Sequence, residues 1–296
     1  MCGIIGFLSP ADPAPLPGDE VFDAIGALTA WQPGGVAPLD LTGAQRDELG
    51  ARLAAVQAAA YRWMLPSGFL AAVADAKVQA RLHEEACRLE AWAAALDTAG
   101  AAPHREGRDI ELLGLLAGGG RDVAWQLQHD LLDGVEPALA LCRGRDDESP
   151  LVLAHAWQLS FLLTAIDRLE VRGRDSAGLA VYLRFPAAEA LDTFLAGPGG
   201  TAARRQELAD RLGGAALPHL ALLRPATAPD TLLAMFKVAS EVGRMGDNVA
   251  ALREAITGDD LFQAALREPG VRLQALGHTR WASNGVISVP NCHPVD

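Results

Sequence analysis

The sequence opens with MCGIIGF over residues 1–7, so a cysteine directly follows the initiator methionine. Once Met1 is removed, Cys2 would carry a thiol and a free α-amine on the same carbon, which combines a nucleophile and a base in one residue. An N-terminal amine has an ordinary pKa of about 7.7–8.0, so part of it is neutral near pH 7 and can accept the thiol proton. The alternative is that Met1 stays and Cys2 is an ordinary buried residue, because free cysteine is among the most buried residue types.

Two further stretches carry residues that could serve such a nucleophile. Residues 168–178 read RLEVRGRDSAG, and residues 277–285 read GHTRWASNG and are followed by NCHP at 291–294. In the second stretch, the planar guanidinium of Arg280 could offer two parallel donors to a carboxylate. Taken alone, Arg280 is more simply explained as a surface or structural ion pair, and His293 as a structural histidine.

Together and in this order, the three stretches resemble the glutaminase domain of class II (N-terminal nucleophile) glutamine amidotransferases. Within that group they look most like glutamine–fructose-6-phosphate aminotransferase (isomerizing), whose pattern runs CGI-G, RLEYRGYDSAG, HTRWATHG and N-HP. The sibling family, amidophosphoribosyltransferase, has Gln where this chain has His293 and a Tyr-Ser-Thr type sequence where it has residues 281–283. Both differences favour the aminotransferase branch, although the resemblance covers only a small part of the chain.

The resemblance implies a role for each matched residue. Cys2 would attack the side-chain amide of L-glutamine with its own α-amine as general base, which would give a thioester and ammonia, and water would then release glutamate. Arg280 matches the arginine that binds the substrate's α-carboxylate. Trp281 matches a tryptophan on the loop that closes over glutamine, and is otherwise a half-buried aromatic anchor. The implied supporting residues, in the turn near the nucleophile and in the N-HP motif, are Arg172, Gly173, Asp175 and His293.

The chain departs from the family pattern in several places. Val171 and Arg174 stand where the family has tyrosines, and these changes could alter loop packing. Ser283 and Asn284 stand where the family has Thr-His, and because a hydroxyl and an amide remain, both are expected to bind glutamine with altered geometry. The family's oxyanion hole uses Asn and Gly of an HNG motif after N-HP, and an acidic residue that grips the substrate amine comes later; both would lie beyond Asp296. Losing one oxyanion donor costs about 10²–10³ in rate. These residues alone are therefore expected to be an inefficient glutaminase.

The strands expected to position these residues are short apolar runs bounded by turn residues. Residues 2–8 read as a buried strand that holds Cys2 at the lip of a sheet. Residues 151–170 read as a helix that leads through a turn into a strand at 179–183, and residues 273–281 read as another strand. The fold implied by the resemblance is α+β, the four-layer α/β/β/α sandwich of the N-terminal-nucleophile hydrolases, only partly present and with a large helical insertion.

Much of the remaining sequence has apolar residues at helical spacing. Helices are predicted over residues 44–65, 69–96 and 121–142, with breaks at the loop 100–109 and at the glycine triplet 118–120. Neither this region nor the stretch between the second and third motifs has a counterpart in the family pattern. Residues 1–296 are therefore expected to be one C-terminally truncated glutaminase domain with a helical insertion over 20–150 and a second, mostly helical insertion over 187–268.

The composition argues against several classes of protein. The formal net charge of −12 is unsuited to a nucleic-acid-binding surface. Four cysteines (Cys2, Cys87, Cys142 and Cys292) are too few for a disulfide scaffold in 296 residues and indicate a reducing cytosol. No basic segment followed by an apolar stretch opens the chain, so no signal peptide is expected and the predicted location is cytoplasmic.

Neither a membrane span nor a metal is expected. The most apolar stretch, residues 150–166, is interrupted by polar side chains and is shorter than the roughly 20 residues that a spanning helix needs, so it reads as a buried helix. The histidines show no metal-ligand spacing with Cys or acidic residues, and no cofactor is expected.

The sequence therefore predicts a glutamine-hydrolysing domain that supplies ammonia for converting fructose 6-phosphate to glucosamine 6-phosphate. Its partners would be L-glutamine and a downstream sugar-phosphate isomerase domain that is absent from this chain, and the resemblance leaves a homodimer open. Two alternatives remain. One is the glutaminase domain of another amidotransferase such as amidophosphoribosyltransferase, and the other is a non-catalytic, glutaminase-like regulatory or interaction module.

Overall fold

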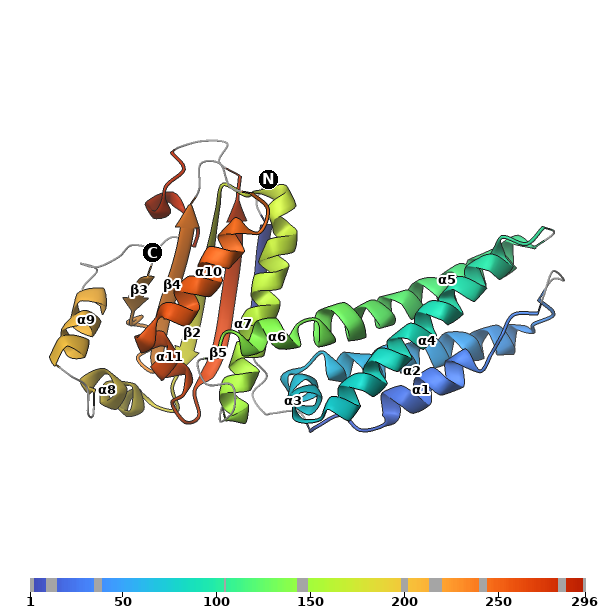
Figure 1. The fold of residues 1–296 in the computed structure, drawn as a ribbon, viewed down its shortest axis with the longest axis horizontal. Helices are drawn as coiled ribbons and strands as arrows, with labels where there is room; N and C mark the ends of the chain where they lie inside the picture. The colour runs from blue at the N-terminus through green and yellow to red at the C-terminus, as the bar shows by residue number, and fades with distance from the viewer. Residues whose placement is uncertain are drawn as a thin grey trace. The chain divides into compact units, whose positions relative to one another are not determined.

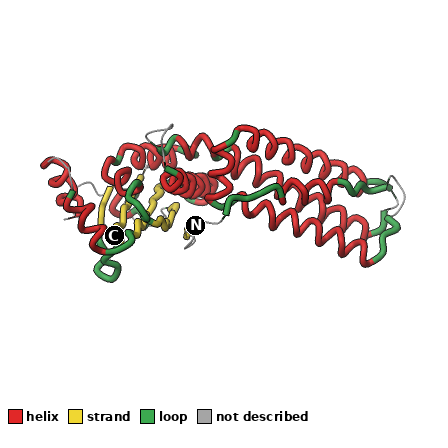
Figure 2. Tube along the Cα trace, turned by 90° about the horizontal axis from the view of Figure 1, so that it is seen from below, coloured by secondary structure: helices red, strands yellow, loops and turns green. Residues whose placement is uncertain are grey.

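The chain has a mixed α+β fold that divides into two compact units. The computed structural model describes residues 3–8, 15–34, 39–103, 105–142, 149–197, 202–212, 220–239, 244–281 and 286–294. Residues 12–136 form one unit, here called the helical unit, and residues 1–11 with 137–296 form the other, here called the sheet unit. Figure 2 shows helices in red in both units and strands in yellow only in the sheet unit.

The described part of the helical unit consists of helices and their connections (Figure 1). In chain order they are α1 (Glu20–Thr29), α2 (Gly43–Trp63), α3 (Pro66–Ala74), α4 (Ala76–Gly100), α5 (Gly107–Trp125), a π-helix at Gln126–Leu132 and α6 (Val135–Leu139), which crosses the unit boundary. Leucines at helical spacing on α2, α4 and α5, among them Leu53, Leu89 and Leu116, are buried between these helices. This unit has its own apolar core, as a separately folded domain requires.

The helix predicted over 44–65 is confirmed, and the stretches 69–96 and 121–142 are largely helical but are each divided into more than one helix. Two predicted boundaries are wrong. The helix expected over 69–96 is interrupted at Asp75, whose carboxylate accepts the Lys77 N–H at 2.8 Å and so caps the start of α4. The glycine triplet expected to break the chain lies inside α5. Gly119 and Gly120 are buried beside Leu53 and Trp92, and this packing outweighs the weak helix propensity of glycine.

The sheet unit is built on one five-stranded antiparallel sheet, as far as the residues described show. Its strands are β1 (Gly3–Leu8), β2 (Ser176–Arg184), β3 (Leu220–Leu223), β4 (Thr231–Ala239) and β5 (Arg272–Arg280), in the spatial order β1-β5-β2-β4-β3. Its helices are α7 (Pro150–Leu169), α8 (Ala188–Ala196), α9 (Ala202–Leu212), α10 (Asp247–Gly258) and α11 (Asp260–Leu266), with 3-10 turns at Glu170–Arg172 and Val289–Asn291. β5 is therefore flanked by β1 on one side and β2 on the other.

The core of the sheet unit lies on one face of the sheet. Alternate residues of the strands, such as Leu179, Phe236 and Leu273, join the buried cluster together with α7, α10 and α11. Figure 1 shows α10 and α11 lying over the strands, with α7 beside β5 and β1. On the opposite face of β5, Gln274 and Leu276 are exposed. The sheet is thus covered by helices on one face, whereas the other face of β5 has exposed side chains.

Two expectations about fold need restating. Residues 187–268 were expected to be mostly helical, but this stretch contains β3 and β4, and β4 pairs with β2 along its whole length. The described residues of this stretch are still mostly helical, but the two strands, which belong to the central sheet, were not expected. The α+β class is confirmed. The four-layer sandwich, and the assignment of 20–150 and 187–268 as insertions into a glutaminase domain, stay predictions.

One described helix, Pro150–Arg172, is long and apolar enough to cross a membrane by length and composition. The core helix of a globular domain passes the same test. More than half of its apolar window is buried within the chain, and α7 packs against β1, β5 and α10. Packing in the sheet unit therefore accounts for the apolar character of this helix, as expected for residues 150–166.

Candidate functional site

The described parts of the three sequence motifs meet at one end of the sheet. β1 and β2 both run antiparallel to β5, so both begin where β5 ends. Gly3 pairs with Thr279, and Ser176 pairs with Arg280. Cys2 is bonded to Gly3 but lies outside the described residues, as do Ser283 and Asn284. We call this edge of the sheet, formed by residues 3, 172–178, 278–281 and 291–294, the motif end.

The turn that precedes β2 packs directly on the end of β5. The Asp175 N–H donates to the Arg280 carbonyl at 3.2 Å. Gly173 is buried, and a Cβ built on it would lie 2.7 Å from the carbonyl carbon of Arg280 and 2.7 Å from the Trp281 nitrogen. A side chain at position 173 would therefore force the turn away from β5. Arg172 is exposed beside this contact, and Trp281 is 52% exposed.

The segment 291–294 returns over the face of the sheet opposite the helices. Arg280 Nη1 donates to the Asn291 carbonyl at 2.6 Å. The His293 carbonyl lies against Gly178, where an added Cβ would be 2.0 Å from that oxygen. His293 Nδ1 is 3.4 Å from His278 Nε2, and the two rings meet edge to face with centroids 4.7 Å apart. The fold thus brings Arg280 and His293 to the start of β2, although both are distant in sequence from the turn that precedes this strand.

His278 is buried, and its surroundings disfavour the charged form of its imidazole. Burial lowers the pKa of its imidazole, and the neighbouring His293 and Arg280 lower it further. Among the described residues no atom forms a hydrogen bond with His278 Nδ1. A neutral imidazole suits a position beside the Arg280 guanidinium, because a second positive charge there would be repelled.

The thiol of Cys292 is a structural group rather than a second nucleophile. Its side chain is fully buried, and Sγ lies 3.1 Å from the Ala177 carbonyl. Burial raises the pKa of this thiol, against smaller lowering effects from Ser176 and from Lys237, which is itself buried. A buried thiol held in its protonated form is a poor nucleophile.

Two residues that position the motif end carry no assigned role in the sequence analysis. Glu170 is buried, and its Oε2 accepts the Gly246 N–H at 2.6 Å. Burial raises the pKa of this carboxyl, and Asp167 and Asp247 add to the effect. Asn248 Nδ2 donates to the Arg174 carbonyl at 2.9 Å. The start of α10 is therefore tied to the turn before β2 by contacts that no local sequence pattern could have indicated.

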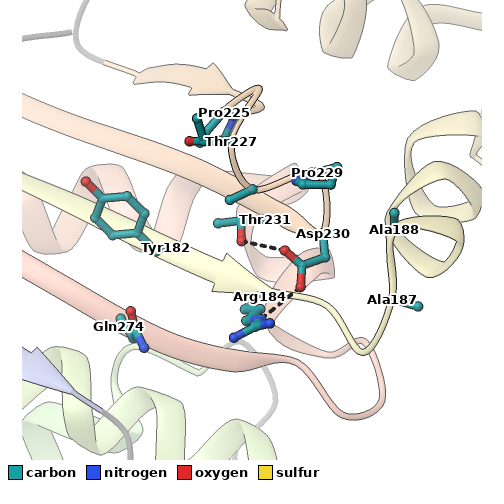
Figure 3. Close-up of a pocket in the computed structure, with 11 residues that line it drawn as sticks. Tyr182, Arg184, Ala187, Ala188, Pro225, Thr227, Pro229, Asp230, Thr231 and Gln274 are labelled. Atoms are coloured by element: carbon teal, nitrogen blue, oxygen red, sulfur yellow. Dashed lines mark hydrogen bonds and ion pairs between the residues drawn. The ribbon is translucent and has the colours of Figure 1, made fainter.

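A cavity of about 740 Å³ lies at the other end of β2 and β5, here called the open end (Figure 3). Tyr182, Arg184, Thr231 and Gln274 point from the strands, and the loop at 225–230 closes one side. Arg184 Nε pairs with Asp230 Oδ2 at 2.8 Å, and this ion pair lowers the pKa of Asp230.

The open end is remote from the motif end. Ser176 and Arg184 are opposite ends of β2, so at the usual rise per strand residue the two sites are separated by about 27 Å. None of the motif residues that the structure describes lines the open-end cavity. In the part of the chain that the structure describes, no group of His, Cys, Asp and Glu side chains could hold a metal ion.

Comparisons with protein-family models, with curated proteins and with solved structures return no match.

Proposed function

We propose that the protein is a glutamine-hydrolysing domain of the class II amidotransferase type, with its active site at the motif end. The observation that supports this proposal is the convergence of the motifs. Arg280, Trp281, Gly173, Asp175 and His293 come from three separate parts of the sequence and surround the ends of the strands that begin at Gly3 and Ser176. A chance likeness between short sequence patterns would not require these parts of the chain to be in contact.

In the proposed reaction, the α-amine of Cys2 takes the thiol proton as Sγ attacks the side-chain amide carbon of glutamine. The C–N bond breaks, the leaving nitrogen takes the proton and departs as ammonia, and a thioester remains on Cys2. Water then attacks the thioester carbon, glutamate leaves, and the thiol is restored. Arg280 would bind the substrate's α-carboxylate with its guanidinium. Half-exposed Trp281 would cover the bound substrate.

The finer aspects of the proposal follow the resemblance. The sheet would be one layer of the four-layer N-terminal-nucleophile sandwich, and its uncovered face would receive further structure. The ammonia would pass to a sugar-phosphate isomerase domain that makes glucosamine 6-phosphate from fructose 6-phosphate. His293, which contacts His278 where the phosphoribosyl-transferring sibling has Gln, favours this acceptor. The enzyme would act in the cytoplasm and need no cofactor.

The test is an intact-mass measurement with and without 6-diazo-5-oxo-L-norleucine, an electrophile that mimics glutamine. The expected result is a mass without Met1, a single label on Cys2, and protection of Cys2 by excess L-glutamine. Cys2→Ser should abolish the label, whereas Cys292→Ser should leave it. A retained Met1, or a label on Cys2 that glutamine does not prevent, would contradict the proposal.

Arg280 offers a second, graded test. Loss of a charge-assisted contact with the substrate's carboxylate costs about 1.5–3 kcal/mol, or roughly 10- to 100-fold. Arg280→Gln should therefore slow labelling of Cys2 by that factor at low reagent concentration. Arg184→Gln is the matched control, because Arg184 lies in the same sheet but at the open end and outside the motifs. Cys2 of this variant should be labelled at the wild-type rate.

A further inference from the structure

A second set of reactive side chains lies in the helical unit, in a hollow of about 280 Å³ between α4 and the π-helix 126–132. Single π-helical turns are rare and often occur at functional sites. The polar and aromatic side chains that line the hollow are His83, Cys87, Glu90, Trp125, Gln128 and His129. None of them belongs to the three motifs, so the proposed glutaminase site leaves this hollow unexplained.

The side chains of Cys87, His83 and Gln128 form a connected chain. Cys87 Sγ lies 3.7 Å from His83 Nε2, one helical turn away on α4. His83 Nδ1 lies 2.6 Å from Gln128 Oε1, which comes from the π-helix. Gln128 Nε2 in turn donates to Asp133 Oδ1 at 3.1 Å. The thiol of Cys87 thus contacts an imidazole, and that imidazole in turn contacts the side chain of Gln128, which orients it.

The hydrogen bonds around His83 determine its tautomer, and so whether the nitrogen that faces the thiol can accept a proton. Because the Gln128 amide nitrogen donates to Asp133, its oxygen is the atom that faces His83. A carbonyl oxygen can only accept, so Nδ1 of His83 must carry the hydrogen. The neutral ring then presents the lone pair of Nε2 to Cys87 Sγ. This is the arrangement in which a histidine can take a proton from a nucleophile.

We propose that Cys87 is a nucleophilic thiol that undergoes exchange with small cationic disulfides. Sγ attacks one sulfur of the disulfide while His83 Nε2 takes the thiol proton. A new S–S bond forms, the old one breaks, and the departing thiolate takes the proton and leaves as a thiol. Cys87 is oxidised to a mixed disulfide and the departing sulfur is reduced, so the disulfide itself is the oxidant.

The lining of the hollow indicates this class of reactant. It contains no Lys or Arg that could stabilise an oxyanion, so acyl transfer is not supported, whereas disulfide exchange needs only a proton acceptor. The volume admits a small molecule and not a protein chain. Among the described lining residues, Glu90 is the one carboxylate. The Trp125 side chain is 51% exposed and packs against the His129 ring with centroids 4.2 Å apart. A carboxylate and a partly exposed aromatic ring both attract a cation.

The test measures the rate of mixed-disulfide formation at Cys87 in the full chain with cystamine at pH 7, by peptide mass spectrometry after an acid quench. The native chain should react at least tenfold faster at Cys87 than the chain in concentrated urea, a threshold set below the usual general-base contribution of about 10²–10⁴. His83→Gln should remove this advantage. Gln57→Ala, which changes an exposed side chain on α2 that does not line the hollow, is the control and should stay within about twofold of wild type.

Two outcomes would overturn the proposal. If Cys87 reacts no faster in the native chain than in urea, or if His83→Gln leaves the rate unchanged, Cys87 is an ordinary exposed thiol. The charge of the reactant is tested with the anionic dithiodiglycolate, which should react more slowly than cystamine. Glu90→Gln should narrow that difference, whereas Glu111→Gln, exposed on α5, should not. Equal rates for the two disulfides would refute the cationic class.

Discussion

The two ends of β2 and β5 differ in how the chain is packed. At the motif end, backbone lies against backbone at Gly173 and Gly178, and the surroundings of buried His278 disfavour its charged form. At the open end, an exposed arginine pairs with Asp230 beside a large cavity. The end of the sheet that has the cavity is thus the less constrained of the two ends. The sequence motifs therefore coincide with the end of the sheet at which backbone lies against backbone, and not with the end that has the cavity.

The largest effect that separates the two ends is expected from Gly178→Ala. A Cβ at this position would lie 2.0 Å from the His293 carbonyl oxygen, so the segment 291–294 must move. Overpacking costs about 1–3 kcal/mol of unfolding free energy, and contact with backbone rather than with a flexible side chain puts this position at the upper end. The urea midpoint of the sheet unit should fall, and buried Cys292 should become reactive towards a thiol reagent.

Gly258→Ala is the matched control for this substitution. Gly258 is the last residue of α10, and a Cβ there meets nothing within 4 Å. Its replacement should be neutral or slightly stabilising. The contrast between the ends would fail if Gly178→Ala kept the wild-type midpoint and left Cys292 protected.

A smaller effect is expected in the dependence of stability on pH. The folded-state pKa of His278 is lowered, so between that pKa and the ordinary value of about 6.5 the unfolded chain binds more protons. The contribution of His278 to stability is therefore complete above about pH 6.5 and is lost as the pH falls. His155, whose pKa burial lowers to about 4, acts in the same direction, so the variant must be compared with wild type.

The measurement is the urea midpoint of His278→Gln and of the wild type between pH 7.5 and 5.5. Removing His278 should reduce the slope by at most one proton, or about 1.4 kcal/mol per pH unit. Asp230→Asn at the open end should leave the slope in this range unchanged, because the lowered pKa of Asp230 puts its titration at more acid pH. Identical slopes for His278→Gln and wild type would show that His278 is not held neutral by burial.

The smallest expected effects come from the two arginines. Arg280→Gln removes the donor to the Asn291 carbonyl and should lower stability by about 1 kcal/mol, because the group is only partly buried. Arg184→Gln breaks an ion pair whose arginine side chain is 65% exposed, and should leave the thermal midpoint unchanged within error. The stability changes of both variants are measured by thermal unfolding at pH 7. A larger loss for Arg184→Gln than for Arg280→Gln would reverse the comparison.

The sequence was sufficient to predict the strands that carry the motifs and the helix between them. β1, β2 and β5 are apolar runs next to glycine-containing turns, and α7 has a clear helical stripe. β4 was missed because TLLAMFKVA is a nearly continuous apolar run rich in helix-forming residues, and such runs cannot be told from a buried helix segment by periodicity. Pairing with β2 favours the strand conformation of this segment, and the sequence of the segment alone does not indicate that pairing.

The candidate site was predictable only in part for the same reason. Residue types and order identified Arg280, Trp281 and the turn at 172–175, because short motifs record them directly. Glu170 and Asn248 act by holding α10 against that turn, which depends on contacts between residues more than seventy positions apart. Burial of His278 and Cys292 likewise follows from the segment 291–294 folding back over the sheet, and composition cannot indicate this.

The pairing of Gly3 with Thr279 also orders events during synthesis of the chain. β5 emerges from the ribosome on the order of tens of seconds after β1, at the usual 5–20 residues per second. The helices of residues 12–136 are local in sequence and can fold during that interval, as low contact order favours. Among the described strands, β1 therefore stays without its partner in the sheet until β5 has been synthesised.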